Sequence, residues 1–310
     1  MARRPLTKTE LEGHSIVYSY ATISVGHIEE LQAFIDELDR TGKLSEHETY
    51  REYITSARYA LPDDFPEARS IIAFALYVKL MRAAFHLDGT AHDVLVPPQY
   101  YGLGLPKDAV ATVIKNEILP SPEHRLERLQ HGYLKLLSVR SGLARYGRNN
   151  ITYVEGMGSF LMHVAFVTDC GFPDEWTDLG MMPQCESCRI CLESCPTGAI
   201  REHQFVIDAA KCVPLYNEVP GDFPAWLPTN AHNATVGCMR CQLPCPANRE
   251  VAADAGRLPD ITEQETLAIL GEVRDKDALA SAGDKLRIDH GESQTFETIS
   301  RNMRALLRPS

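Results

Sequence analysis

The stretch CESCRICLESCP occupies positions 185–196 and decides the fold of this part of the chain. Its four cysteines follow the spacing C-x2-C-x2-C-x3-C, and a proline comes directly after the last cysteine. In proteins with two iron–sulfur clusters, three cysteines of such a run bind one [4Fe–4S] cluster and the fourth binds the other. The short spacing lets one tight turn direct three thiolates at the same cluster. The stretch therefore predicts two clusters.

A second run, CMRCQLPCP at positions 238–246, repeats the last three cysteines and the proline of the first. At the position of the missing first cysteine stands Thr235, which cannot be a cluster thiolate. Cys212 lies between the two runs and is the available substitute, so that two clusters use eight of the nine cysteines. The prediction assigns Cys185, Cys188, Cys191 and Cys245 to one cluster and Cys195, Cys212, Cys238 and Cys241 to the other.

Two other uses of these cysteines are considered. A zinc module also contains C-x2-C pairs, but it takes its four ligands as two separated pairs and has no need of the C-x3-C-P ending. A disulfide framework is disfavoured because the cysteines are confined to one part of a long chain without a secretion signal. The ninth cysteine, Cys170, is expected to be a buried and inert thiol.

Length and composition limit the class of protein. A chain of 310 residues is long enough for about two domains, and a hydrophobic content of 44% supports a substantial core. The net charge of −11 argues against a broad nucleic-acid surface. No apolar run approaches the ~20 residues that cross a membrane. Paired arginines at positions 3 and 4 are followed by charged residues instead of an apolar export segment, which favours a cytoplasmic protein.

Hydrophobic periodicity predicts both strands and helices. Strands are expected at 16–25, 70–78, 151–154 and 159–168, with the last two joined by a hairpin-like turn at 155–158. Helices are expected at 28–38, 121–142, 262–270 and 295–307, and Thr262 and Glu265 are expected to form a capping box at the start of the third. Residues 94–101 are expected to form an edge strand or a loop, because two adjacent prolines cannot both donate to a sheet. The fold class is therefore α/β (α+β), with domains expected at 1–180, 181–250 and 251–310.

Other cofactor motifs are missing from the sequence. No P-loop occurs, and no G-x-G-x-x-G follows a strand, so nucleotide hydrolysis and Rossmann dinucleotide binding are unsupported. Iron–sulfur clusters pass single electrons and rarely reduce an organic substrate themselves. The residues alone thus predict a soluble electron-transfer protein with an α/β partner domain.

Several short stretches resemble a known family. They are SGLARYGRNN at 141–150, GS at 158–159, VTD at 167–169, CPTGAI at 195–200, VID at 206–208 and the second cysteine run. Together they are similar to the cobalamin-dependent iron–sulfur reductases, the family that contains epoxyqueuosine reductase and the reductive dehalogenases. The resemblance implies a nitroreductase-like corrinoid-binding domain, then a bacterial-ferredoxin-like domain with two [4Fe–4S] clusters, and a short helical tail.

The same resemblance implies the cofactors and the partners. A base-off cobalamin would lie beside the nearer cluster and receive electrons from reduced ferredoxin or flavodoxin through the clusters. No D-x-H-x-x-G motif occurs, so no histidine is expected as lower cobalt ligand. The residues expected to line the corrin are Gly142, Tyr146, Gly147, Arg148, Asn149, Asn150, Gly156, Gly158 and Ser159. Alternative roles for Arg148 are binding of a substrate anion and formation of an ion pair on the surface.

The proton donor is the point at which the sequence departs from the family. Epoxyqueuosine reductases carry an aspartate acid on the segment before the SGL stretch, but no aspartate occurs between Leu119 and Lys135. Glu123 or Glu127 are possible substitutes, although a solvated helix surface is the favoured interpretation for each. Dehalogenases use a tyrosine instead. The tyrosines considered are Tyr100, Tyr101, Tyr133 and Tyr146, each of which also suits core or rim packing.

Three functions follow from this combination. The first is a dehalogenase-like oxidoreductase that cleaves a carbon–halogen or carbon–oxygen bond of a small molecule. The second is epoxyqueuosine reduction on tRNA. The acidic net charge makes this function less expected, and the sixty residues after Glu250 are too few for the family's tRNA-binding repeats. The third is a non-catalytic electron carrier or corrinoid-handling protein.

Overall fold

The computed structural model describes residues 6–101, 103–106, 108–129, 132–202, 206–288 and 296–308. The chain forms two compact units, each built from separate segments. Unit 1 contains residues 1–77, 105–188 and 203–206, and unit 2 contains residues 78–104, 189–202 and 207–310. The predicted division at residues 180 and 250 stays a prediction. Within the described ranges, no helix is long and apolar enough to span a membrane.

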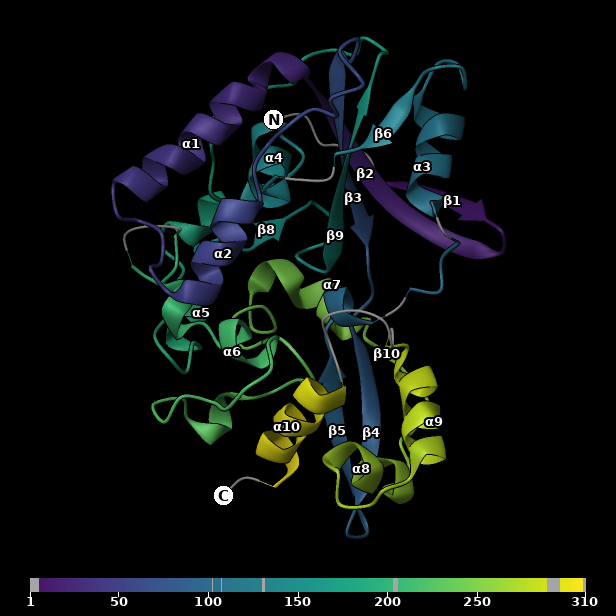
Figure 1. The fold of residues 1–310 in the computed structure, drawn as a ribbon, viewed down its shortest axis with the longest axis vertical. Coiled ribbons are helices and arrows are strands. Elements are labelled where there is room, and N and C mark those ends of the chain that lie inside the picture. The colour runs from purple at the N-terminus through teal and green to yellow at the C-terminus, as the bar shows by residue number, and fades with distance from the viewer. Residues whose placement is uncertain are drawn as a thin grey trace. The chain divides into compact units, whose positions relative to one another are not determined.

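Unit 1 is organised around a five-stranded antiparallel sheet (Figure 1). Its strands, in spatial order, are β1 (Thr7–Leu11), β2 (His14–Ser24), β3 (Ser70–Tyr77), β9 (Leu161–Thr168) and β6 (Leu126–Arg128). A separate pair consists of β7 (Arg145–Tyr146) and β8 (Thr152–Tyr153). The helices of this unit are α1 (Ile28–Arg40), α2 (Glu48–Ser56), α3 (Ala109–Val113), which continues as a π-helix over Ile114–Ile118, and α4 (Leu134–Arg140).

Both faces of strand β3 are buried, which explains its continuous apolar sequence. Ile71, Ala73 and Ala75 belong to the core cluster that also contains apolar residues of α1, α2 and α4. On the opposite face, Phe74 stacks on Tyr18 of β2 with ring centroids 4.8 Å apart. The mixed α/β class and the strands predicted at 16–25 and 70–78 are confirmed.

The helix predicted over 121–142 is wrong in its first half. Residues Leu126–Arg128 form strand β6, because they pair with β9 at the sheet edge and the Leu129 amide donates to the Ala165 carbonyl at 2.9 Å. Gly132 then takes a φ of +124°, which a helix cannot accommodate. A Cβ atom at Gly132 would lie 2.5 Å from the Tyr59 ring. Helix α4 therefore begins only after this glycine.

The predicted hairpin over 151–168 is also only partly correct. Strand β8 pairs with β7, and β9 pairs with β3, so that a single bridge from Val154 to Gly158 is all that joins the two predicted strands. The helix predicted at 28–38 is confirmed as α1. The segment predicted as an edge strand or loop forms strand β5 up to Val96, and a 3-10 turn over Pro98–Tyr100 follows.

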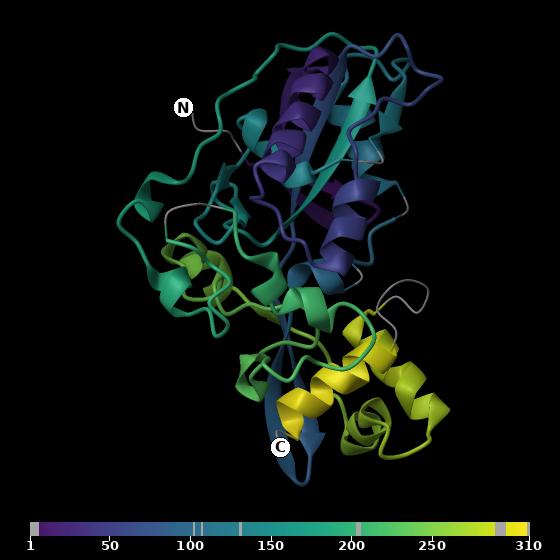
Figure 2. The ribbon, with the colours of Figure 1, turned by 60° about the vertical axis from the view of Figure 1, so that its left-hand side comes forward.

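Unit 2 contains a small sheet and all but two of the predicted cluster cysteines. The sheet consists of β4 (Met81–Leu87), β5 (Thr90–Val96) and β10 (Gly256–Arg257), in the order β10-β4-β5. Helices α8 (Glu263–Leu270), α9 (Lys276–Leu286) and α10 (Phe296–Leu307) belong to this unit, and α8 contacts both of the others (Figure 2). The cysteine segment carries the short helices α5 (Ile190–Glu193), α6 (Pro214–Asn217) and α7 (Arg249–Ala253). The helices predicted at 262–270 and, within the described residues 296–307, at 295–307 are confirmed.

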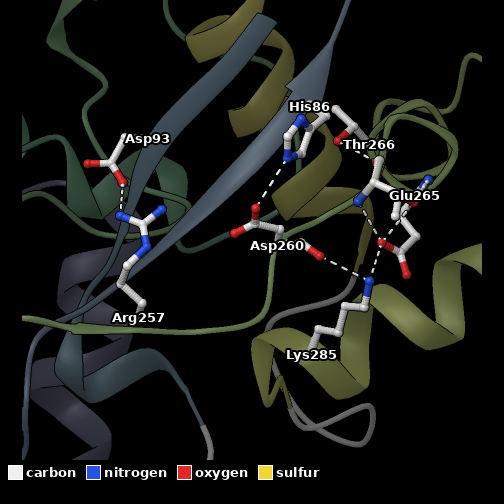
Figure 3. Close-up of polar contacts among 8 residues, drawn as sticks. His86, Asp93, Arg257, Asp260, Glu265, Thr266 and Lys285 are labelled. Carbon is white, nitrogen blue, oxygen red and sulfur yellow. Dashed lines mark hydrogen bonds and ion pairs between the residues drawn. The ribbon is translucent and has the colours of Figure 1, made fainter. Parts of the chain in front are cut away.

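A buried carboxylate links α8 to α9 (Figure 3). Glu265 is 5% exposed and completes the predicted capping box with Thr262. It accepts hydrogen bonds from Lys285 Nζ at 2.7 Å and from Ser281 Oγ at 2.6 Å. Burial alone would raise the pKa of Glu265, but the hydrogen bonds from Lys285, Ser281 and Thr262 outweigh it and lower the pKa to about 2.

This network predicts a specific dependence of stability on pH. Since the pKa of Glu265 lies below its ordinary value of 4.5 in the folded state, the stabilisation is complete above that pH and is lost as the pH falls towards about 2. We expect Glu265→Gln to lower the free energy of unfolding by about 2 kcal/mol at neutral pH and by less near pH ~3. Urea unfolding at both pH values measures this, with the exposed Glu297→Gln as control. A difference between wild type and Glu265→Gln that does not change with pH would contradict the assignment.

Candidate functional site

All four cysteines predicted to bind the second cluster belong to unit 2. They are Cys195, Cys212, Cys238 and Cys241. Burial raises the pKa of the Cys212 thiol, and the negative charges of the Cys241, Cys238 and Cys195 thiolates raise it further. The sulfur of Cys212 is thus within electrostatic range of the other three. Iron would reverse this repulsion, because thiolates that repel each other are stabilised by shared cations. The arrangement fits the assignment of these four cysteines to one cluster.

The sulfur of Cys195 is surrounded by hydrogen-bond donors. Burial would raise the pKa of this thiol, but the Thr197 hydroxyl and the backbone amides of Thr197, Ala199 and Ile200 lower it overall. The sulfur and the Thr197 hydroxyl are 3.5 Å apart. Donors that stabilise a thiolate suit a cluster ligand, and hydrogen bonds to the sulfurs also set the reduction potential of a cluster.

The turn that carries Cys185 and Cys188 in unit 1 is held by one buried guanidinium. Arg148 is 7% exposed. It donates to the backbone carbonyls of Cys185, Glu186 and Cys188, the last two at 3.3 Å each. The fork of donors in a guanidinium can reach several carbonyls at once, which an ammonium cannot do with the same geometry. Arg148 therefore positions a cysteine turn, a role that the sequence analysis missed. The remaining two predicted ligands, Cys191 and Cys245, lie in unit 2.

The other residues predicted to line a corrin form a tight loop in unit 1. The Gly147 amide donates to the Ile151 carbonyl at 2.7 Å, and the Asn149 amide nitrogen donates to the Tyr153 hydroxyl at 3.0 Å. A Cβ atom at Gly147 would lie 2.6 Å from both Asn149 and Tyr153, so this position requires glycine. Glycine or asparagine with positive φ occurs at Gly142, Asn150, Gly156 and Gly158, and Ser159 is buried beside them.

Unit 1 contains a cavity of about 290 Å³. Its lining includes apolar residues of α1 and α2, four tyrosines and one charged side chain among the described residues. The described lining residues are Phe34, Ile35, Leu38, Leu44, Tyr50, Tyr53, Ile54, Gly132, Tyr133, Leu134, Lys135, Leu136, Tyr146, Asn150 and Val206. Of the predicted site residues, the cavity thus brings together Tyr133, Tyr146 and Asn150. Its volume suits a small molecule and is far too small for a corrinoid.

Tyr133 is fixed in the wall of this cavity. Its hydroxyl donates to the Ile54 carbonyl at 2.6 Å, and its own carbonyl accepts from the Tyr59 hydroxyl at 2.7 Å. Burial, followed by the neighbouring Tyr53 and Tyr50, raises the pKa of Tyr133 to about 12. A hydroxyl that is engaged with a carbonyl and has a raised pKa is a poor proton donor.

The other predicted proton donors are placed elsewhere. Tyr100 and Tyr101 belong to unit 2, where the Tyr100 hydroxyl donates to the Glu218 carboxylate and the Tyr101 hydroxyl donates to the Lys79 carbonyl. Glu123 is exposed in a loop of unit 1 before β6. Tyr100 and Tyr101 thus belong to one unit and Glu123 and Tyr133 to the other, and which residue donates the proton stays a prediction.

A set of buried amides was not predicted. Asn217 and Asn302 are fully buried and hydrogen-bond the backbone just before Cys238. A fixed spacing from the cysteines does not mark either residue, so the sequence offered no signal for them. Within the described ranges, no three His, Cys, Asp or Glu side chains surround a point suited to one metal ion. The thiolates of a cubane bind different irons and do not need to converge on one point.

Comparison with known sequences identifies the cysteine-rich region. A sequence-family model described as "4Fe-4S double cluster binding domain" matches residues 184–248, so this region is a double-cluster binding domain. The chain is 30% identical over 123 residues to epoxyqueuosine reductase of Atelocyanobacterium thalassa, which covers 39% of each protein. The chain spans less than half of the length of the curated epoxyqueuosine reductases that it matches.

Solved structures of epoxyqueuosine reductases are similar to this chain in fold. Epoxyqueuosine reductase from Bacillus subtilis, with its catalytic aspartate loop swung out of the active site, has a TM-score of 0.59 at 20% identity, covering 94% of this chain and 76% of that one. An epoxyqueuosine reductase bound to an epoxyqueuosine-modified tRNA stem loop has a TM-score of 0.60 at 19% identity, with coverage of 94% and 76%. A reductive dehalogenase structure has a TM-score of only 0.31. The predicted resemblance to iron–sulfur oxidoreductases of the epoxyqueuosine reductase family is confirmed, and the epoxyqueuosine reductases are the better match of the two branches.

The cluster assignment predicts a contrast between two cysteines. We expect Cys212→Ser to retain about four of about eight irons per chain, because it removes one ligand of one cluster only. Cys170→Ser should retain all of them, since Cys170 is a buried thiol outside both runs. Iron, zinc and sulfide analysis after anaerobic purification measures this. Full iron in Cys212→Ser, or equal loss in both variants, would contradict the assignment.

The role of Arg148 predicts a defect without any change of ligand. Arg148→Lys keeps the charge but cannot hold three carbonyls, so we expect the cluster that uses Cys185 and Cys188 to be lost more readily. Iron content after dilution into chelator should fall by up to about four irons per chain. The exposed Arg128→Lys is the control. An Arg148→Lys protein that keeps its iron as long as wild type would contradict this role.

Proposed function

We propose that this protein is a two-cluster iron–sulfur reductase that cleaves a carbon–oxygen bond of an epoxide, as its relatives' name describes for epoxyqueuosine. The observation that supports this most is the combination of the double-cluster domain at 184–248 with a fold similar to epoxyqueuosine reductases over more than nine-tenths of the chain. This reverses the order of the sequence-based hypotheses, in which the dehalogenase-like activity came first.

The chemistry requires two electrons and two protons for each epoxide. The eight cysteines would hold two clusters that deliver the electrons singly from reduced ferredoxin or flavodoxin. A bound cobalamin would supply the strongly reducing centre that attacks the substrate. The cavity of unit 1 does not fit a corrinoid, and Arg148, Gly147 and Asn149 already serve the protein's own loops. Corrinoid binding is therefore proposed from the resemblance alone.

The residues of unit 1 contribute a place for the substrate. We propose that the cavity of about 290 Å³ accepts the epoxide-bearing part, with tyrosine rings excluding water from it. Lys135 is the charged side chain among the described lining residues, and its Nζ donates to the Asn150 carbonyl at 3.2 Å. It is a better donor for an oxygen that develops negative charge than Tyr133, whose hydroxyl is engaged.

A second candidate is reductive cleavage of a small free molecule, including a carbon–halogen bond. Two observations favour it. The cavity has the volume of a small ligand, and no aspartate occurs between Leu119 and Lys135, where epoxyqueuosine reductases carry their acid. The net charge of −11 likewise offers little to a tRNA.

The test is a direct comparison of substrates. Protein purified anaerobically from cells supplied with cobalamin should contain about eight irons and one corrinoid per chain. With a low-potential donor, we expect turnover of epoxyqueuosine in tRNA or as the free nucleoside, and the ratio of the two rates reports whether tRNA is recognised. Turnover of halogenated aromatics alone would support the second candidate. Iron without corrinoid and without turnover would leave the electron-carrier hypothesis.

A further inference from the structure

The backbone that leads into Cys238 is held by two fully buried amide side chains of unit 2. Asn217 donates to the Gly237 carbonyl at 2.6 Å and accepts from the Gly237 amide at 3.0 Å. Asn302 of α10 donates to the Asn217 carbonyl at 2.8 Å and to the Thr235 carbonyl at 3.0 Å. Any shift of this loop would leave buried polar groups unpaired, at a cost of about 1–3 kcal/mol each. The loop is therefore a fixed platform for Cys238.

The ring of Tyr100 covers this platform. Gly237 has a φ of +70°, and a Cβ atom there would lie 2.4 Å from Cε2 of Tyr100 and 3.1 Å from its hydroxyl oxygen. Real side chains do not approach so closely, so the ring is packed directly against the glycine backbone. Because Gly237 precedes Cys238 in the chain, the ring lies over the segment that presents a predicted ligand of the second cluster.

The hydroxyl of Tyr100 brings a carboxylate to the same place. It donates a hydrogen bond to Glu218, which follows α6. Glu218 follows Cys212 in a compact turn of the backbone. The Leu215 amide donates to the Cys212 carbonyl at 3.1 Å, and the Glu218 amide donates to the Pro214 carbonyl at 3.2 Å. Tyr101, the next residue, points its hydroxyl to the Lys79 carbonyl instead.

We propose that Tyr100 is a positioning residue for the cluster of Cys195, Cys212, Cys238 and Cys241: its ring keeps water from the Gly237–Cys238 backbone, and its hydroxyl holds Glu218 near Cys212. The inference rests on the proposed two-cluster function and assigns Tyr100 a role other than proton donor. Both effects have the same sign. Water would stabilise the more negative, reduced cluster, so its exclusion by the ring lowers the reduction potential. A nearby carboxylate lowers the potential as well, because it repels the added electron.

Redox titration followed by electron paramagnetic resonance tests this without any substrate. We expect Tyr100→Phe and Glu218→Gln to keep about eight irons per chain and to shift the midpoint potential of one cluster to less negative values. The other cluster should keep its potential and thereby serves as an internal reference. Tyr101→Phe is the matched control, because it removes the hydroxyl of the neighbouring tyrosine, which donates to the Lys79 carbonyl, and should leave both potentials unchanged.

The outcomes separate this inference from the proposed function. Eight irons and unchanged potentials in both Tyr100→Phe and Glu218→Gln would overturn this inference and leave the proposed function standing. If turnover falls in Tyr100→Phe while the potentials stay unchanged, Tyr100 is a proton donor instead. Loss of about four irons in Tyr100→Phe but not in Tyr101→Phe would support positioning. Equal iron loss in the two tyrosine variants would overturn it. Wild-type protein without iron would remove both the inference and the function.

Discussion

A cysteine thiolate can serve a cluster only if the short turn that carries it keeps its backbone in place, and this constraint governs both cysteine segments. In each case the support comes from a polar side chain outside the cysteine runs. Arg148 donates to three carbonyls of the turn that holds Cys185 and Cys188. Asn302 and Asn217 bind the backbone around Gly237. Buried polar contacts of this kind stabilise only when every partner is present, so they define one geometry.

The two units are built differently. Unit 1 buries both faces of strand β3 and contains a cavity lined by tyrosine rings and by apolar residues of α1 and α2. Unit 2 has a smaller sheet and holds its cysteine segment with loops and short helices. Helices supply much of the lining of the cavity in unit 1, while loops can follow the irregular surface of a cluster.

Regular elements with a strong local signal could be predicted from the sequence. Helix α8 was predicted because its capping box is a local motif, and strand β3 because it is a continuous apolar run. The hairpin of β4 and β5 was missed although the sequence Asp88-Gly89 favours a two-residue hairpin turn, in which both residues take the positive φ that the structure shows. Strand β6 was misjudged because Leu126 and the following Leu129 also fit a helical stripe, and only the partner strand β9 decides between strand and helix.

The candidate site was likewise predictable only where its signal is local in the sequence. Cysteine spacing is a local property and indicates two clusters, and the family comparison agrees for residues 184–248. The partners of those cysteines depend on distant contacts. Arg148 precedes Cys185 by thirty-seven positions in the chain, and Asn302 follows Gly237 by sixty-five. No spacing rule links such pairs, so the sequence suggested a corrin contact for Arg148 and gave no role to Asn302.

The position of Asn302 in α10 has a consequence for biosynthesis. All eight cysteines have left the ribosome once Cys245 has emerged, but the clamp on the Gly237 loop is made by a helix that is translated more than fifty residues later. A nascent chain therefore exposes a full set of thiolates before one of their platforms is rigid. Iron bound at that stage would exchange readily, and stable cluster binding requires that α10 has been synthesised and has folded.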